Sequence, residues 1–230
     1  MPPRTQQHPR LSNHMDFWQY WLTFHPDQQL VSTILSYIQD GIPVEFKGPD
    51  DHYICNNWKS AHEYANEVES FIHTHLERGA IIGPLHDLPA GYRASPLGAF
   101  KKKRSSKVRV IHDLSWPPGG SVNDFINAKD ATVTYVSVDH AANNCMLYDT
   151  PWLTKIDIQS AFLSCHVRPE DSKLLGFSWT NKQGQRLCYM MQVLAFGLKT
   201  SPKKIRRHLK SPPIYHGKKG GITISHSVFR

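Results

Sequence analysis

The pattern of apolar and polar residues predicts two amphipathic helices before position 80. In the first, residues 27–39, apolar side chains recur at helical spacing and the following Gly41 supplies a stop. In the second, Ser60 and Glu63 form a capping-box pattern, an apolar face follows, and Gly79 stands where a left-handed residue ends a helix. Each helix is therefore expected to pack one face against a core.

Shorter apolar runs separated by Gly and Pro dominate the rest of the chain. They predict strands over 80–82, 97–103, 107–114, 152–158, 173–179 and 187–193. The second and third of these are expected to form a hairpin with a turn at 104–106. One further helix is predicted over 137–147. Because helices and strands mix without strict alternation, the predicted fold class is α+β.

Composition supports a folded protein. The 230 residues are 40% hydrophobic and 11% aromatic, which is enough for one large domain or two small ones. The four cysteines are scattered and form no CxxC pair, which favours reduced thiols in an intracellular protein of the cytoplasm or nucleus. No stretch approaches the ~18 apolar residues of a membrane helix, so neither membrane insertion nor secretion is expected.

The net charge of +8 is unevenly distributed along the chain. Residues 1–171 carry 15 Lys and Arg against 19 Asp and Glu, whereas residues 172–230 carry 12 basic residues and no acidic one. This basic quarter predicts contact with a polyanion such as nucleic acid, or alternatively a solvated tail whose charges have no partner. For the residues after Pro202 the tail is the favoured interpretation.

Candidate chemistry begins with Asp157 and a basic run. Asp157 ends a predicted strand, a good place for a metal ligand, although such a carboxylate also often caps the next helix. Six cations and no acid lie between Lys101 and Arg109. On a two-stranded ribbon Lys107 and Arg109 can converge on a phosphate, with the arginine supplying a two-pronged donor. The alternatives are a solvated turn or a nuclear-import patch.

A third motif, VLAFGLKTSP, contains a Phe-Gly turn. Gly197 permits a close backbone approach to a ligand, and Phe196 beside it could line a pocket. Pro202 fits the first turn of a following helix. Phe162, five residues beyond Asp157, would on its own more often belong to a core.

These motifs together carry a family resemblance. The segments SPLGAFKKK, KVRVIHDLSWPPGGSVNDFI, LTKIDIQSAFLSCHVRPEDSKLLGFSW and AFGLKTSP resemble the reverse transcriptase of a DIRS-type (tyrosine-recombinase) retrotransposon or a near relative among long-terminal-repeat elements. The resemblance runs from about His25 to Pro202. It implies a right-hand polymerase with fingers and an incomplete palm. The implied division is an N-terminal extension (1–59), the first part of the fingers (60–129), a palm strand and helix (130–165), a fingers return (166–196), and an incomplete palm with a divergent basic tail (197–230).

The resemblance also assigns roles to residues. It implies that Asp157 is catalytic and, with Ile158, binds Mg²⁺, and that Phe162 packs under the sugar of an incoming deoxynucleotide. The nucleotide-binding residues would be Lys102, Lys107, Arg109, Phe162, Phe196 and Gly197. The implied partners are an RNA or DNA template with its primer and a deoxynucleoside triphosphate. This chain departs from the family's usual Pro-Phe-Gly, with Ala195 in place of the proline.

A larger departure concerns the metal ligands. The family takes two more carboxylates from a later Tyr-x-Asp-Asp hairpin, but Asp171 is the last acidic residue of this sequence. We therefore expect an RNA-directed DNA polymerase domain that is truncated and inactive on its own. The alternatives are a non-enzymatic nucleic-acid-binding module and a retroelement remnant without function.

Overall fold

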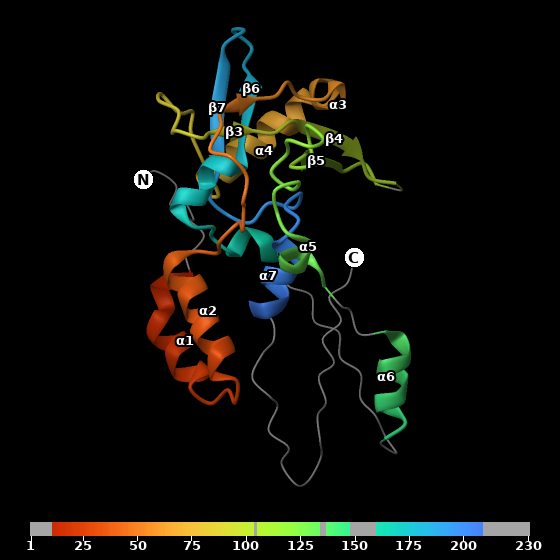
Figure 1. Cartoon of the computed structure of the whole chain (residues 1–230). Helices are drawn as coiled ribbons and strands as arrows, with labels where there is room; N and C mark the ends of the chain where they lie inside the picture. The colour runs from red at the N-terminus through yellow and green to blue at the C-terminus, as the bar shows by residue number, and fades with distance from the viewer. Residues whose placement is uncertain (1–10, 104, 134–136, 148–159, 209–230) are drawn as a thin grey trace, which may run out of the picture.

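A mixed sheet organises the upper half of the molecule in Figure 1. The computed structural model describes residues 11–103, 105–133, 137–147 and 160–208. Within these residues, five strands form a sheet of order β1-β3-β6-β7-β2, in which β1–β3 and β3–β6 are parallel and the other pairs antiparallel. The strands are β1 (Tyr53–Ile54), β2 (Ile81–Ile82), β3 (Arg93–Ala94), β6 (Gly176–Thr180) and β7 (Arg186–Met191). The α+β class is confirmed.

The β6–β7 hairpin is the longest pairing of this sheet. Phe177 lies opposite Tyr189, and their rings stack with centroids 5.3 Å apart. The strand predicted over 173–179 begins only at Gly176, because Pro169–Leu175 form a 3₁₀ helix, η3. Asp171 anchors that turn, since its carboxylate accepts a hydrogen bond from the backbone N–H of Val44 at 2.8 Å.

The predicted basic hairpin is confirmed as a separate two-stranded sheet. It pairs β4 (Leu97–Lys101) with β5 (Val108–His112) in antiparallel register, with Leu97 opposite His112 and Ala99 opposite Val110. These four residues alternate with outward-facing ones and pack toward the main core, as expected for a ribbon with one buried face.

The second predicted helix is divided into α3 (Lys59–Glu63) and α4 (Ala65–Glu77). The capping-box prediction for Ser60 and Glu63 is wrong, because helix α3 has already begun and the Ser60 hydroxyl instead accepts a hydrogen bond from the N–H of Ala99 at 3.2 Å. Tyr64, with φ −116° and ψ 43°, breaks the helix. Gly79 has φ +68° and ends α4 as predicted.

Two N-terminal helices form a unit with a small core of their own, drawn at the lower left of Figure 1. The short η1 (Leu11–His14) leads into α1 (Met15–Leu22), and α2 (Gln28–Asp40) follows. The helix predicted over 27–39 is confirmed, with the Asp27 side chain capping it by accepting from Leu30 N–H at 2.9 Å. The buried residues of this unit are Leu22, Val31, Ile34 and Ile38.

The remaining helices are short. They are α5 (Ala128–Ala131), α6 (Val138–Cys145), the 3₁₀ helix η2 (Ala161–Ser164) and α7 (Ser201–His208). Helix α6 confirms the helix predicted over 137–147, and α7 confirms the one predicted to start near Pro202. The strand predicted over 152–158 lies outside the described residues. No helix of the described residues is long and apolar enough to span a membrane.

Within the described part of the segment after Pro202, Lys204 of α7 contradicts the expected tail without charge partners, whereas residues 209–230 lie outside the described residues. The Lys204 side chain is 4% exposed, and its ammonium lies 3.0 Å from the Tyr37 hydroxyl and 2.5 Å from Glu45 Oε1. Glu45 adopts φ +66°, which is uncommon for a residue other than glycine. A buried ammonium must be paired, so this contact fastens α7 to α2 and to the extended segment that follows it.

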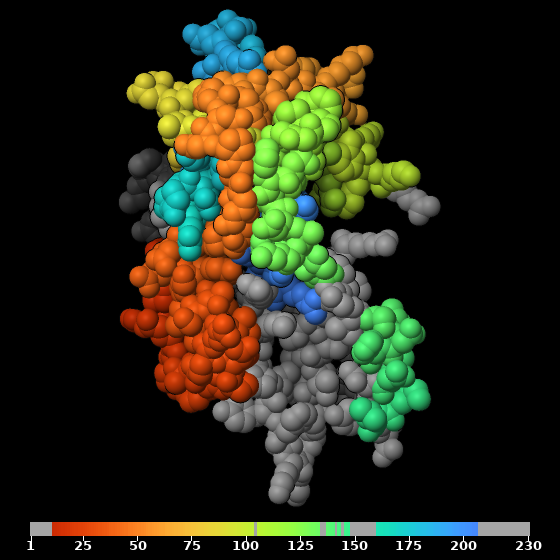
Figure 2. All heavy atoms as spheres, viewed as in Figure 1, coloured from red at the N-terminus to blue at the C-terminus, as the bar shows by residue number. Residues whose placement is uncertain are grey.

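Arginine 93 is the largest fully buried side chain of the described residues, with 1% of its surface exposed. The guanidinium lies 4.7 Å from the ring centre of Tyr53 and 4.9 Å from that of Phe46, and it forms an ion pair with Asp51. It also donates to the carbonyl of Gly120 at 2.8 Å. In Figure 2 the orange segment around residue 50 and the neighbouring green segment lie side by side on one face. Arg93 joins both to the sheet through Asp51 and the Gly120 carbonyl.

Arg93→Lys should lower the free energy of unfolding by about 2 to 4 kcal/mol, because an ammonium can neither stack between two rings nor reach both acceptors. Urea unfolding followed by circular dichroism measures the loss. Arg78→Lys, at an exposed position after α4, is the matched control and should change the midpoint little. Equal midpoints for the two variants would contradict the structural role of Arg93.

Candidate functional site

The outward side of the β4–β5 hairpin gathers the cations predicted from sequence. Residues directly opposite each other in an antiparallel pair share a face. Phe100 lies opposite Arg109, and the Lys102 N–H donates to the Lys107 carbonyl at 3.0 Å, which extends the pairing toward the turn. We call the resulting surface the outer face; its residues are Gly98, Phe100, Lys102, Lys107, Arg109 and Ile111.

The three predicted phosphate contacts therefore lie on one surface and are exposed. Lys102 and Lys107 are close to each other across the ribbon, and Arg109 is two residues further along β5 than Lys107. No carboxylate belongs to the outer face as defined. A surface with this charge attracts phosphate groups, and its arginine can bind one with two parallel hydrogen bonds.

Aromatic side chains continue the outer face away from the turn. Trp58 lies over Gly98, where an added Cβ would be 3.3 Å from the indole ring. Trp116 packs edge-to-face against Trp58, with ring centres 5.0 Å apart. Phe100, Ile111, Trp58 and Trp116 are 43%, 39%, 38% and 39% exposed. The outer face and the two tryptophans thus combine cations with exposed rings, the composition that single-stranded nucleic acid prefers.

Neither tryptophan is among the site residues predicted from sequence. The Trp-Pro-Pro-Gly-Gly segment at 116–120 is part of the run that carries the family resemblance, but the resemblance assigns no role to Trp116. Trp58 is fixed by a hydrogen bond from its indole N–H to Asp113 Oδ2 at 3.2 Å. The loop after β5 is therefore part of the surface and holds its two rings together.

The structure brings Phe162 and Phe196 together, although they are distant in sequence. Their ring centres are 4.7 Å apart with planes at 71°, an edge-to-face arrangement. Phe162 lies in η2 and is half-buried, whereas Phe196 is 71% exposed. An exposed ring held by a partly buried one can pack against a ligand.

Gly197, beside Phe196, lies against the end of β5. An added Cβ would be 2.0 Å from the carbonyl oxygen of His112, so only glycine fits. Asn123 fixes the turn on its other side, since its amide donates to the Gly197 carbonyl at 2.8 Å and its side-chain oxygen accepts from the N–H of Lys199 at 2.8 Å. The close backbone approach predicted for Gly197 is thus made to β5, and its role toward a nucleotide stays a prediction.

His112 belongs to the core rather than to a relay. Its Nε2 donates to the Gly176 carbonyl at 2.9 Å, and its ring meets Phe177 edge-on. Burial lowers the pKa of the imidazole to about 4, so it is neutral at physiological pH. The neighbouring Asp113 carboxylate accepts a hydrogen bond from Trp58 instead, so His112 and Asp113 form no catalytic pair.

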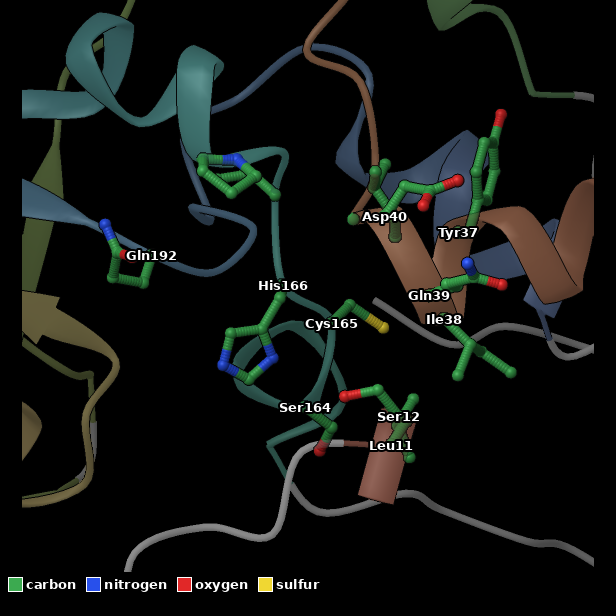
Figure 3. Close-up of a pocket in the computed structure, with 14 residues that line it drawn as sticks. Leu11, Ser12, Tyr37, Ile38, Gln39, Asp40, Ser164, Cys165, His166 and Gln192 are labelled. Carbon is green, nitrogen blue, oxygen red and sulfur yellow. The ribbon is translucent and has the colours of Figure 1, made fainter. Parts of the chain in front are cut away.

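A cavity of about 80 Å³ lies between the end of α2 and residues 164–169 (Figure 3). Figure 3 shows the Cys165 side chain directed toward α2 and the His166 ring directed to the other side of the segment. Burial raises the pKa of the Cys165 thiol to about 12, so the nucleophilic thiolate is negligible at neutral pH. The adjacent Cys-His pair therefore forms no catalytic unit.

The predicted metal site cannot be placed. Asp157 and Ile158 lie outside the described residues. Among the residues that are described, no group of three or more His, Cys, Asp or Glu side chains could hold a metal ion. The predicted Mg²⁺ contact thus stays an expectation based on resemblance.

No protein-family model matches this chain, and no curated protein matches it. The outer face, the two tryptophans and the Phe162–Phe196 pair are the features that bear on its function.

Acid should destabilise the protein through His112. The unfolded imidazole binds a proton below about pH 6.5, whereas the folded one resists protonation until about pH 4. The free energy of unfolding should thus be fully maintained above pH 6.5 and fall by about 2 to 3 kcal/mol as the pH drops to 4. Urea titrations across this window should show a shallower pH slope for His112→Phe. A slope unchanged by this variant, with His73→Gln at an exposed histidine as control, would contradict the assignment.

Proposed function

We propose that this chain is a reverse-transcriptase-like fingers and palm segment that binds a deoxynucleoside triphosphate and a template-primer but does not copy nucleic acid by itself. In this proposal Lys102, Lys107 and Arg109 contact the triphosphate, and Phe162 with Phe196 and Gly197 forms the sugar and base pocket. The division into fingers and palm segments predicted from sequence belongs to the same proposal.

One observation carries it. Phe196 and Gly197 are held at the His112 end of β5, and Arg109 projects from the same strand three residues earlier, or about 10 Å along it. The Phe-Gly turn and β5 are far apart in sequence, so their contact is a result of the fold and not of chain connectivity. A nucleotide could thus reach cations with its phosphates and aromatic rings with its sugar and base.

The proposal does not include catalysis by these 230 residues. Two Mg²⁺ ions need several carboxylate oxygens, whereas Asp157 is the single aspartate that the resemblance assigns to this role and no acidic residue follows Asp171. One carboxylate does not fit a two-ion site. Polymerisation would require further carboxylates in addition to those of these 230 residues.

Primer extension tests the catalytic part. The purified chain, with Mg²⁺ or Mn²⁺, template-primer and deoxynucleotides, should incorporate no more nucleotide than its Asp157→Ala variant. Robust incorporation abolished by Asp157→Ala would overturn the claim of inactivity.

Fluorescence titration with a deoxynucleoside triphosphate tests the binding part. Arg109→Gln should weaken nucleotide binding about 10- to 100-fold, because one bidentate charged contact is lost. Lys182→Gln, at an exposed lysine of the β6–β7 turn, should leave nucleotide binding unchanged.

A second candidate function is a non-enzymatic module that binds single-stranded nucleic acid. The exposed Trp58–Trp116 pair favours it, because rings beside cations bind a strand without requiring any metal or nucleotide pocket. This function needs the outer face and the tryptophans but not Phe196 or Asp157.

Salt titration with a single-stranded oligonucleotide separates the contributions of charge and stacking. Replacing both Lys107 and Arg109 by Gln should reduce the slope of log K against log salt by about 1.4, since each lost phosphate contact contributes about 0.7. Trp116→Ala should weaken binding by about 1 to 3 kcal/mol with the slope kept. Binding that is insensitive to both variants would exclude this surface as the nucleic-acid site.

A further inference from the structure

Helix α1 carries two apolar stripes, and only one of them is covered. Met15, Trp18 and Leu22 face α2 and contribute to the small N-terminal core. The second stripe contains Phe17, Tyr20, Trp21 and Phe24, which are 56%, 61%, 53% and 50% exposed. We call these four residues the aromatic stripe. Phe17, Tyr20 and Trp21 lie along one side of α1 at spacings of three and four residues, and Phe24 follows in the turn just after the helix.

The rings of the aromatic stripe already support one another. The ring of Tyr20 packs edge-to-face against those of Trp21 and Phe24, with ring centres 5.4 Å and 5.6 Å apart. The ring centres of Phe17 and Trp21 are 6.2 Å apart. Side chains with two χ angles that are held in this way lose little conformational freedom when a partner covers them. The stripe is therefore a pre-ordered surface for association.

Charge excludes two classes of partner. Residues 11–46 contain no Lys or Arg and four acidic residues. A nucleic acid requires cations to contact its phosphates, and an amphipathic helix that binds anionic membranes carries Lys and Arg on its polar side. The aromatic stripe has neither, so its partner is a protein surface that offers apolar side chains and little charge.

We infer that the aromatic stripe is a self-association surface and that two copies of this chain pair through α1 about a two-fold axis. A stripe at helical spacing packs against another such stripe, and two-fold pairing presents the same stripe from each copy. Asp16 is the single charged residue within α1, so few like charges face each other across the contact.

The exposed area sets the strength of the dimer. Four aromatic side chains of about 150–250 Å² each, half exposed, present roughly 300–500 Å² per copy. Pairing then buries at most roughly 600–1,000 Å², below or at the 1,000–1,200 Å² at which stable specific interfaces begin. The dimer should thus be weak and concentration-dependent, forming in the micromolar range.

Sedimentation equilibrium of the full chain tests this inference. The wild-type protein should shift from monomer to dimer up to about 100 µM, and the double variant Phe17→Ser, Trp21→Ser should raise the dissociation constant at least about tenfold. Both residues are exposed, so circular dichroism and the urea midpoint should stay close to wild type. Val138→Ser removes an 83% exposed apolar side chain from α6 and is the matched control, which should dimerise as wild type does.

Three outcomes would overturn the inference: a monomer throughout this concentration range, a dimer that survives the double variant, or a monomer that binds lipid vesicles through the stripe. If the double variant proved unstable, Tyr20→Ser would be measured in the same way, with the same expected weakening. These measurements involve neither nucleotide nor nucleic acid, so they stand apart from the proposed function.

Discussion

A single buried guanidinium determines how the segments of this protein are held together. Arg93 has almost no exposed surface, yet its charge is balanced by one carboxylate, Asp51, which is itself 57% exposed. Removing a guanidinium from water costs several kcal/mol, which must be offset by the rings on its faces and by hydrogen bonds such as that to Gly120. These partners come from the segment after α2, which supplies the carboxylate, and from the loop after β5, which supplies the Gly120 carbonyl. Neither segment can leave the sheet without removing a partner of the buried guanidinium.

The position of the candidate site follows from this constraint. The loop that gives Arg93 the Gly120 carbonyl also provides Asn123, whose side chain holds the Phe-Gly turn by its Gly197 carbonyl and Lys199 amide. The same loop presents Trp116 to Trp58. Hydrogen bonds thus connect Arg93 through this loop to the Phe-Gly turn. Those from Asn123 to Gly197 and Lys199 join segments that are about 75 residues apart in sequence. The site is built on packed elements, which reduces the cost of ordering it around a ligand.

Local patterns in the sequence predicted a large part of this arrangement. Helix α2, the β4–β5 hairpin, α6, the Gly79 terminus and the start of α7 were all recognisable, because apolar spacing and turn residues act over a few positions. The capping box failed because Ser60 bonds to β4, and the start of β6 was misplaced because η3 is fixed by a contact from Asp171 to Val44. The burial of Lys204 and the Trp58–Trp116 pair were missed for the same reason. Each depends on segments that are far apart in sequence, and a single sequence gives no signal for such contacts.

Charge also divides the molecule between two kinds of partner. The hairpin carries cations on its outer face next to exposed rings, whereas residues 11–46 combine exposed rings with acidic side chains and no cation. Aromatic rings bind bases and apolar side chains alike, so the neighbouring charges decide which partner is accepted. A phosphate-bearing strand is attracted to the hairpin and repelled by α1, while an uncharged helical surface desolvates few charged groups at α1. The two surfaces lie on separate parts of the chain in Figure 1, so one partner need not displace the other.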